Sequence, residues 1–342
     1  MAIDDPAPSL QGPLQTKMNR SKGEETPGKK RMRLARLAIA ILLPLAGVVA
    51  LALHQGDHAR AKRLFAERVF YHRHLRPPEN PAELFVLLGY RASAVPVPRT
   101  RVPRRFLAAL PKRMGDLEDV RLKKELFVTA VLPLVLRANE LIAEDRATAE
   151  RLKTKIESGR ALNRYERRWL AAQGRRFAVP PGLEPGTPAW FAALLLRLDT
   201  IPPSLALAQA AIESGWGTAR FAREGNALFG QWTWKDSERG IVPLKRPKGA
   251  RYRIRAFDYL IDSVRAYMLN LNHNPAYREF RYRRAALRRD GIRDHAGLKL
   301  AGTLIRYSTR REAYVAELRT VIVTNRLARF DGVTLEPAMP AG

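Results

Sequence analysis

Apolar residues recur at helical spacing in several segments of this 342-residue chain. Between residues 122 and 146 they predict an amphipathic helix kinked at Pro133, because they fall at steps of three and four, at Leu126, Ala130, Leu134, Ala138 and Leu141. Further helices are predicted over residues 150–158, 164–173, 189–198, 260–274, 297–306 and 311–327. Apolar and basic residues alternate from residue 251 to 256, which predicts a β-hairpin over residues 245–257. The pattern therefore predicts a mainly helical domain with one small β-lobe.

The N-terminal part of the chain has a different pattern. Residues 1–36 are polar and basic, with too few large apolar side chains to fold, so they are predicted to form a disordered tail. Residues 37–53 form an uncharged apolar run that would span roughly 25 Å of a hydrocarbon core of roughly 30 Å. We therefore predict a single transmembrane anchor over residues 37–54. The cations before it predict a cytoplasmic tail, an inner-membrane anchor and a periplasmic catalytic domain.

Two other interpretations of this apolar run stay open. Ala50-Leu51-Ala52 resembles the small-residue site at which a signal peptide is cleaved, so the segment could be removed after export. The segment could also be a buried core helix, although it lacks the polar face that a helix of a globular domain usually has. Extraction of membranes at alkaline pH distinguishes an uncleaved anchor from the other two.

Residues 55–115 are basic and contain seven prolines, at positions 77, 78, 81, 96, 98, 103 and 111. Because such a density of proline forbids long helices, the segment is predicted to be a stiff, extended linker. The folded domain is expected over residues 116–330, and residues 331–342 are expected to form a tail.

Composition excludes some kinds of chemistry and leaves others open. The chain has no cysteine, which excludes disulfides, thiolate zinc sites and a cysteine nucleophile. No spacing of His, Asp or Glu typical of a metal or cofactor site is present, so none is predicted. The net charge of +28 suggests a polyanionic neighbour, although arginines that merely fill solvated surface positions would give the same charge.

Glu213 is the candidate for acid–base chemistry. Pro202 and Pro203 signal a helix start with Ser204 as N-cap, and the helix is expected to end at Gly215 or Gly217. Glu213 then lies in the last turn, where the negative end of the helix and partial burial both disfavour a carboxylate and raise its pKa. A glutamic acid with a raised pKa suits a proton donor in glycoside cleavage. By spacing alone, a glutamate that merely ends a surface helix is the favoured interpretation of Glu213.

The sequence around Glu213 resembles a known family. Residues 207–218 read LAQAAIESGWGT and are followed by FAR, GN and LFGQ up to Gln231. This pattern is similar to the glucosaminidase domain of glycoside hydrolase family 73, and within it to the Bax-type bacterial proteins. The similarity continues through Asn274–Tyr277 and Tyr307–Thr309. The resemblance implies a lysozyme-like α+β fold, an endo-β-N-acetylglucosaminidase that cuts peptidoglycan strands, Glu213 as the catalytic acid and Tyr307 in the catalytic site.

The same resemblance gives expectations for the rest of the cleft. It implies that six residues contact the sugar, namely Trp216, Asn226, Phe229, Gly230, Trp232 and Tyr277. Phe229 and Trp232 could instead be core residues. A second carboxylate, which some family members carry on the hairpin, is missing between residues 240 and 248, and Asp236 and Glu238 are the nearest candidates. Without it, either the N-acetyl group of the substrate attacks, steadied by Tyr307, or a water is directed from elsewhere.

Two other functions remain alternatives. A lytic transglycosylase also uses a single glutamate but leaves anhydro-sugar ends. A non-catalytic wall-binding module would keep the fold and the basic surface without cleavage. Nucleic acid is not expected as a partner, because a membrane segment precedes the domain.

Overall fold

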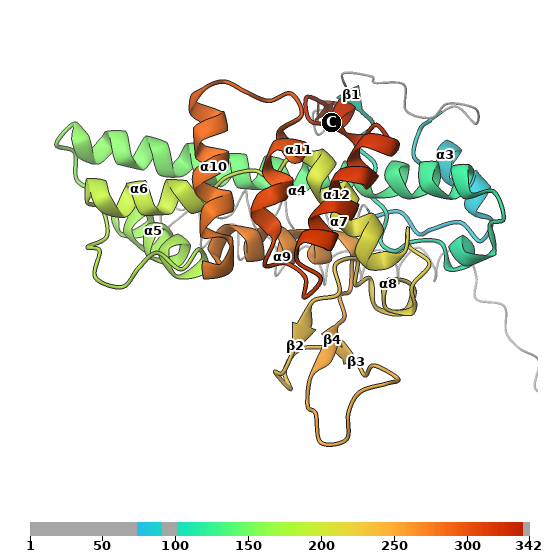
Figure 1. The fold of residues 1–342 in the computed structure, drawn as a ribbon. Helices are drawn as coiled ribbons and strands as arrows, with labels where there is room; N and C mark the ends of the chain where they lie inside the picture. The colour runs from blue at the N-terminus through green and yellow to red at the C-terminus, as the bar shows by residue number, and fades with distance from the viewer. Residues whose placement is uncertain (1–73, 91–100, 338–342) are drawn as a thin grey trace, which may run out of the picture. The chain divides into compact units, whose positions relative to one another are not determined.

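The computed structural model describes residues 74–90 and 101–337, which lie within one compact unit of the chain (Figure 1). The predicted tail and membrane anchor, residues 1–36 and 37–54, lie outside the described residues, as do the last five residues. Their predictions therefore remain untested by the structure.

Helices make up most of the described unit. The α-helices are α3 (Leu84–Leu87), α4 (Val120–Glu157), α5 (Arg164–Arg176), α6 (Pro188–Arg197), α7 (Pro203–Ser214), α8 (Arg220–Gly225), α9 (Leu260–His273), α10 (Arg278–Arg289), α11 (Ala296–Leu300) and α12 (Glu312–Thr324). Short 3-10 helices are η1 (Pro81–Glu83), η2 (Lys112–Asp116), η3 (Pro275–Tyr277), η4 (Ala301–Leu304) and η5 (Leu327–Phe330). The predicted mainly helical class is confirmed, and the lysozyme-like assignment stays a prediction.

The longest helix, α4, joins two of the predicted helices. It begins after Asp119, whose carboxylate accepts hydrogen bonds from the backbone N–H of Arg121 and Leu122, and it continues through Pro133. By length and composition alone, α4 could cross a membrane. Its apolar half, however, is buried against α7 and α9, which is typical of a core helix.

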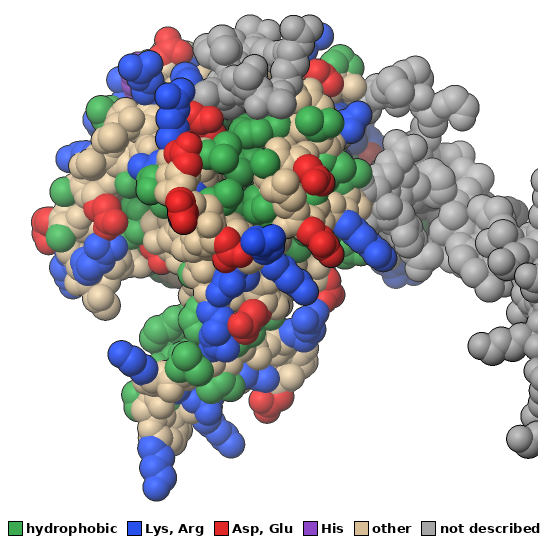
Figure 2. Space-filling view, turned by 90° about the vertical axis from the view of Figure 1, so that its right-hand side faces the viewer, with side chains coloured by type: hydrophobic (Ala, Val, Ile, Leu, Met, Phe, Trp, Pro, Cys, Tyr) green, Lys and Arg blue, Asp and Glu red, His purple; other side chains and the backbone are tan. Residues whose placement is uncertain are grey.

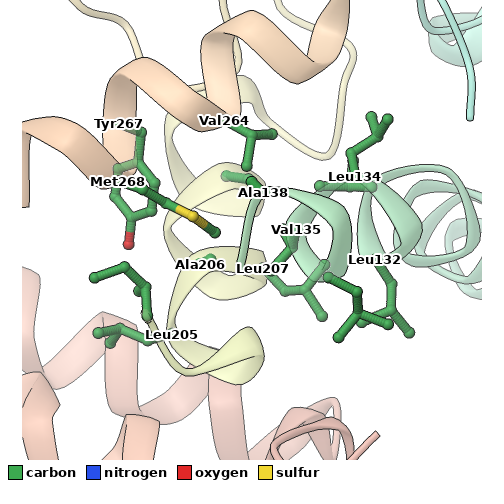
Figure 3. Close-up of a cluster of buried hydrophobic side chains, with 14 of the residues drawn as sticks. Leu132, Leu134, Val135, Ala138, Leu205, Ala206, Leu207, Val264, Tyr267 and Met268 are labelled. Atoms are coloured by element: carbon green, nitrogen blue, oxygen red, sulfur yellow. The ribbon is translucent and has the colours of Figure 1, made fainter. Parts of the chain in front are cut away.

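The core of the unit is built around α7. Figure 3 shows Leu205, Ala206 and Leu207 of α7 between side chains of α4, including Leu132, Val135 and Ala138, and side chains of α9, namely Val264, Tyr267 and Met268. On its other sides α7 contacts α11, α12 and η5. A helix covered on all sides needs no polar face, and its alanines allow neighbouring helices to approach closely. The helix that carries Glu213 is therefore fixed in the interior of the unit.

The N-terminus of α7 is capped by a residue distant in sequence. The predicted N-cap, Ser204, is wrong: the helix begins at Pro203 and Pro202 offers no side-chain hydrogen bond. Instead, the Asp331 carboxylate accepts hydrogen bonds from the Ser204 backbone N–H and hydroxyl, both at 2.9 Å, and from the Gly297 N–H at 3.2 Å. Asp331 thus satisfies free N–H groups of α7 and joins its start to α11.

The structured unit extends beyond the predicted boundaries. Leu84, Val102, Leu107 and Leu110 belong to the core, although they lie in the predicted linker. Strand β1 (Arg101–Val102) pairs in parallel with β5 (Thr334–Leu335), so residues of the predicted C-terminal tail are also folded. Proline forbids long helices, but it does not prevent the apolar residues between the prolines from packing against α4. Residues 74–90 and 101–115 are therefore part of the domain.

A small antiparallel sheet forms a separate lobe. Its strands are β2 (Trp232–Thr233), β3 (Gly240–Ile241) and β4 (Arg253–Arg255), in the order β2-β4-β3. Residues 231–256 are called the β-lobe below; in Figure 1 they project from the helices. The predicted hairpin is correct only for β4, where Ile254 is buried between two half-exposed arginines. The partner strand lies before residue 242, and residues 242–252 form the connecting loop.

Candidate active site

Glu213 lies in the last turn of α7, as the sequence predicts. The chain then turns sharply through Gly215, Trp216 and Gly217, which all have positive φ angles. A Cβ atom on Gly217 would lie 2.6 Å from Leu110 Cδ1, so only glycine fits there. The Ser214 hydroxyl donates to the Ala210 carbonyl and accepts from the Gly217 N–H, at 2.6 and 2.9 Å. This turn fixes the end of α7 and with it the position of Glu213.

The surroundings of Glu213 favour its protonated form. Burial raises the pKa of Glu213, and the nearby negative charge of Glu317 raises it further. A side-chain hydrogen bond with Tyr314 and the positive charge of Arg310 act in the opposite direction, but the pKa stays above its ordinary value. The direction agrees with the sequence-based expectation, and the main cause is burial.

Four tyrosines surround this carboxyl group. They are Tyr267 on α9, Tyr277 on η3, Tyr307 before α12 and Tyr314 on α12. The Tyr307 ring stacks on Tyr314 with centroids 5.5 Å apart and lies 6.0 Å from Tyr277 and 6.4 Å from Tyr267. Burial raises the pKa of all four hydroxyls, and the charge of Glu213 raises it further. The tyrosines therefore remain protonated and can act as hydrogen-bond donors.

A buried glutamine links two of these tyrosines to Glu213. The Tyr267 hydroxyl donates to Gln209 Oε1 at 2.7 Å, and Gln209 Nε2 donates to the Tyr314 oxygen at 3.0 Å. Because the Tyr314 oxygen accepts from Gln209, its own proton can point to Glu213, its other hydrogen-bond partner. Gln209 and Tyr314 were not predicted from the sequence. The available signal was a polar residue in an otherwise apolar helix, one turn before Glu213.

Three predicted cleft residues lie at or near this cluster. A Cβ on Gly230 would lie 3.9 Å from Glu213 Oε2, so the Gly230 backbone borders the carboxyl group. Tyr277 packs beside Tyr307, as described above. Phe229 is buried and stacks in parallel on Tyr267 at 3.9 Å, so it supports the tyrosines from within the core.

The other three predicted cleft residues have different surroundings. Trp216 packs edge-on against Phe127, and Lys124 Nζ lies 5.0 Å from its ring centre. Asn226 Nδ2 donates to the carbonyls of residues 257 and 258, at 3.1 and 3.2 Å. Both amide hydrogens of Asn226 are thus used within the protein, and a contact with a sugar would fall to its Oδ1, so the expected role of Asn226 stays a prediction. Trp232 is more than half exposed on the β-lobe, so the core alternative is wrong for it.

The two candidate second acids belong to the β-lobe. Glu238 accepts a hydrogen bond from the Thr233 hydroxyl at 2.7 Å, which lowers its pKa, and Asp236 is fully exposed, 3.6 Å from an Arg253 nitrogen. Both line an open hollow of about 380 Å³ between the lobe and α8. Neither is among the charged groups that shift the pKa of Glu213, so the structure does not bring them to it.

A different acid acts on Glu213. Glu317 on α12 influences the pKa of Glu213 and pairs with Arg310 at 2.6 Å. Neither residue was predicted from the sequence, since nothing in the sequence pattern places α12 beside α7. Among residues 74–90 and 101–337, no cluster of three or more His, Asp or Glu side chains is suited to bind a metal ion.

Comparison with known proteins finds a related family. Residues 191–327 match the model of the glucosaminidase family, described as mannosyl-glycoprotein endo-beta-N-acetylglucosaminidase. The match contains α7 to α12 and so covers Glu213 and all four tyrosines. The family supports a glycosidase with a glycan substrate.

A curated relative extends the comparison. The chain is similar to Protein bax of Escherichia coli (strain K12), with 31% identity over 204 residues. These residues are 56% of this chain and 66% of the relative, so the match spans slightly less than two thirds of that protein. No solved structure matches the chain.

Proposed function

We propose that this protein is an endo-β-N-acetylglucosaminidase that cleaves the glycan strands of peptidoglycan, with Glu213 as its general acid. The observation that carries the proposal is the position of Glu213: a partly buried glutamic acid with a raised pKa, held at the end of a fixed helix inside a ring of tyrosines. The glucosaminidase family match over the same residues supports the reaction class.

The proposed reaction begins with proton transfer from Glu213 to the glycosidic oxygen while the bond between this oxygen and C1 of the sugar breaks. The carbonyl oxygen of the neighbouring N-acetyl group attacks C1 and forms a cyclic oxazolinium ion. Water then attacks C1 while the bond between C1 and the N-acetyl oxygen breaks, and the water gives a proton to the Glu213 carboxylate, which restores the acid. Substrate assistance is favoured because Asp236 and Glu238 do not act on Glu213.

The tyrosines have separate proposed roles. Tyr314 holds the Glu213 carboxyl group, and Tyr307 steadies the N-acetyl group of the substrate. Gly230 leaves room for the sugar beside the acid, because any side chain there would approach Glu213 Oε2. Glu317 helps to keep Glu213 protonated and is itself neutralised by Arg310.

We also propose that the domain works in the periplasm, held at the inner membrane by residues 37–54. The support is the apolar run with a basic flank in the sequence. Alkaline washing of membranes should leave the full chain in the pellet. Release of the chain into the supernatant would contradict the anchor.

Digestion of purified peptidoglycan tests the activity. The full chain in detergent is compared with Glu213→Gln and with Glu224→Gln, a control at an exposed glutamate of α8, and released fragments are identified by mass spectrometry. We expect fragments with reducing N-acetylglucosamine ends, unchanged for the control and reduced by about 10²–10⁴-fold for Glu213→Gln. Fragments with anhydro ends, one water lighter, would make the protein a lytic transglycosylase. No fragments from any variant would favour a wall-binding module.

Product stereochemistry and one further variant test the route. Substrate assistance predicts retention of the anomeric configuration, which NMR of fresh product detects. It also predicts that Glu238→Gln keeps the wild-type rate. Inversion, or a loss as large as that of Glu213→Gln, would show that a second protein carboxylate acts.

A further inference from the structure

The β-lobe carries an unusual share of the exposed apolar side chains. Among the described residues, nine large hydrophobic side chains are exposed, and four of them lie between residues 232 and 244. They are Trp232, Trp234, Val242 and Leu244, with exposed fractions of 54%, 62%, 46% and 87%. Single exposed apolar residues need no explanation, but a concentrated group on one projecting lobe indicates an interaction surface.

The aromatic part of this surface is held in place. Trp232 on β2 stacks on Tyr252, with ring centroids 4.4 Å apart and planes 9° apart. Trp234 lies against Trp232 at 5.9 Å. The stack fixes Trp232 from one side only, so these apolar rings remain turned to solvent rather than to the helical core.

Cations accompany these apolar residues. Residues 239–257 contain seven cations and no acid. Within the described residues, Arg239, Arg253 and Arg255 pair with acids before or after this segment, whereas no ion pair involves Lys245, Lys248 or Arg251 in the loop between β3 and β4. Figure 2 shows Lys and Arg side chains at the lower end of the lobe, beneath its hydrophobic patch.

We propose that the β-lobe docks onto an anionic phospholipid membrane. Leu244 and Trp234 enter the boundary between headgroups and acyl chains, and Lys245, Lys248 and Arg251 contact the headgroup phosphates. Tryptophan and aliphatic side chains flanked by cations are the composition that binds such an interface. Trp232 and Trp234 offer flat faces that suit a sugar ring, but Val242 and Leu244 do not, so the surface as a whole fits a lipid interface better than a sugar chain. The lobe would then hold the catalytic domain against the membrane surface.

A local probe is needed to test this, since residues 37–54 are themselves predicted to enter a bilayer. The chain has no cysteine, so a single cysteine can be labelled with an environment-sensitive dye. The labelled variants are Leu244→Cys on the lobe and Val323→Cys, a control at another exposed apolar position, on α12. Both are made in full-length Glu213→Gln, so that cleavage does not affect the readout. They are mixed with vesicles containing phosphatidylglycerol or with pure phosphatidylcholine vesicles.

The dye at position 244 should shift to the blue and brighten several-fold with phosphatidylglycerol vesicles only, and the dye at position 323 should not change. Lys245→Gln or Lys248→Gln should each weaken lobe partitioning about fivefold, and added salt should weaken it as well. An unchanged dye at 244 in phosphatidylglycerol vesicles would overturn the proposal. If purified peptidoglycan alone produced the shift, the surface would belong to the glycan substrate instead. Because no cleavage is measured, a negative result leaves the proposed activity unaffected.

Discussion

Replacement of Asp199 should destabilise the segment that leads into α7. Asp199 is buried, and its carboxylate binds Arg288 Nε at 2.8 Å and lies 3.7 Å from nitrogens of Arg146 and Arg284. Arg284 is buried as well and donates to the backbone carbonyls of residues 196, 199 and 200. The carboxylate thus neutralises a group of arginines that joins α4 and α10 to the chain just before Glu213's helix.

The expected loss of stability follows from the buried charge that Asp199→Ala leaves without a partner. Asp199→Ala leaves the Arg284 guanidinium buried without its counter-ion, and burial already lowers the pKa of Arg284 to about 10. Removing one partner of a buried ion pair costs about 3–5 kcal/mol in the free energy of unfolding. The double variant Asp199→Ala/Arg284→Met removes both charges and should therefore lose less than Asp199→Ala alone.

Urea unfolding of the full chain measures the loss of stability. We expect the unfolding midpoint to move to a lower urea concentration while the slope of free energy against urea stays constant. Burial alone would raise the pKa of Asp199, but the surrounding arginines outweigh it and the pKa is lowered. The stabilisation is thus present at neutral pH and is lost as the pH falls through the folded-state pKa. The reasoning would be refuted if Asp199→Ala lowered the free energy of unfolding by less than about 1 kcal/mol. It would also be refuted if the double variant were less stable than Asp199→Ala alone.

Three further predictions concern α7 and its acid. Tyr314→Phe removes a hydrogen bond that lowers the pKa of Glu213, so the alkaline limb of the pH–rate profile should move to higher pH, and NMR titration of Glu213 should show the same direction. Glu213→Gln should raise the free energy of unfolding near pH 7 by roughly 0.5–2 kcal/mol in urea titrations, because a raised folded-state pKa makes the ionised form destabilising above it. Gly297→Ala should lower the free energy of unfolding by about 1–3 kcal/mol, since the new Cβ would lie 2.0 Å from Ser204 Oγ. Thermal melts would show this loss of stability. An unchanged pH–rate profile for Tyr314→Phe would contradict its hydrogen bond to Glu213. Unchanged stability would contradict the raised pKa in the case of Glu213→Gln and the close packing against Ser204 in the case of Gly297→Ala.

Local patterns of the sequence predicted the local features of the fold. Spacing located α5, α6, α9 and α12 to within a few residues but divided α4 into two helices, and the proline pair and glycines located α7 with Glu213 in its last turn. The raised pKa of Glu213 also followed, because partial burial of the last turn is implied by the apolar stripe beside it. These features depend on residues close together in the chain.

Features that depend on distant residues were not predictable in the same way. Asp331 caps α7 across more than a hundred residues, and no local signal distinguishes it from Ser204 as the cap. Nothing in the local pattern indicates that the Asn226 amide nitrogen donates to the carbonyls of residues 257 and 258, on the far side of the β-lobe in the sequence. The proline-rich segment looked extended because proline limits helices, whereas its burial depends on the apolar surface that α4 presents.

The candidate site shows why one acidic residue can be recognised while its partners cannot. Glu213 and Gln209 lie one turn apart on α7, so both could be read from one helix. The groups that shift the pKa of Glu213 are Arg310, Tyr314 and Glu317, on or just before α12, and only the tertiary fold brings α12 beside α7. The Gln209 amide on α7 binds both Tyr267 on α9 and Tyr314 on α12, so it connects the helix of Glu213 to residues distant in sequence. Loss of Gln209 should therefore disturb Glu213 through Tyr314, whose position it supports and whose hydroxyl bonds to the Glu213 carboxyl group.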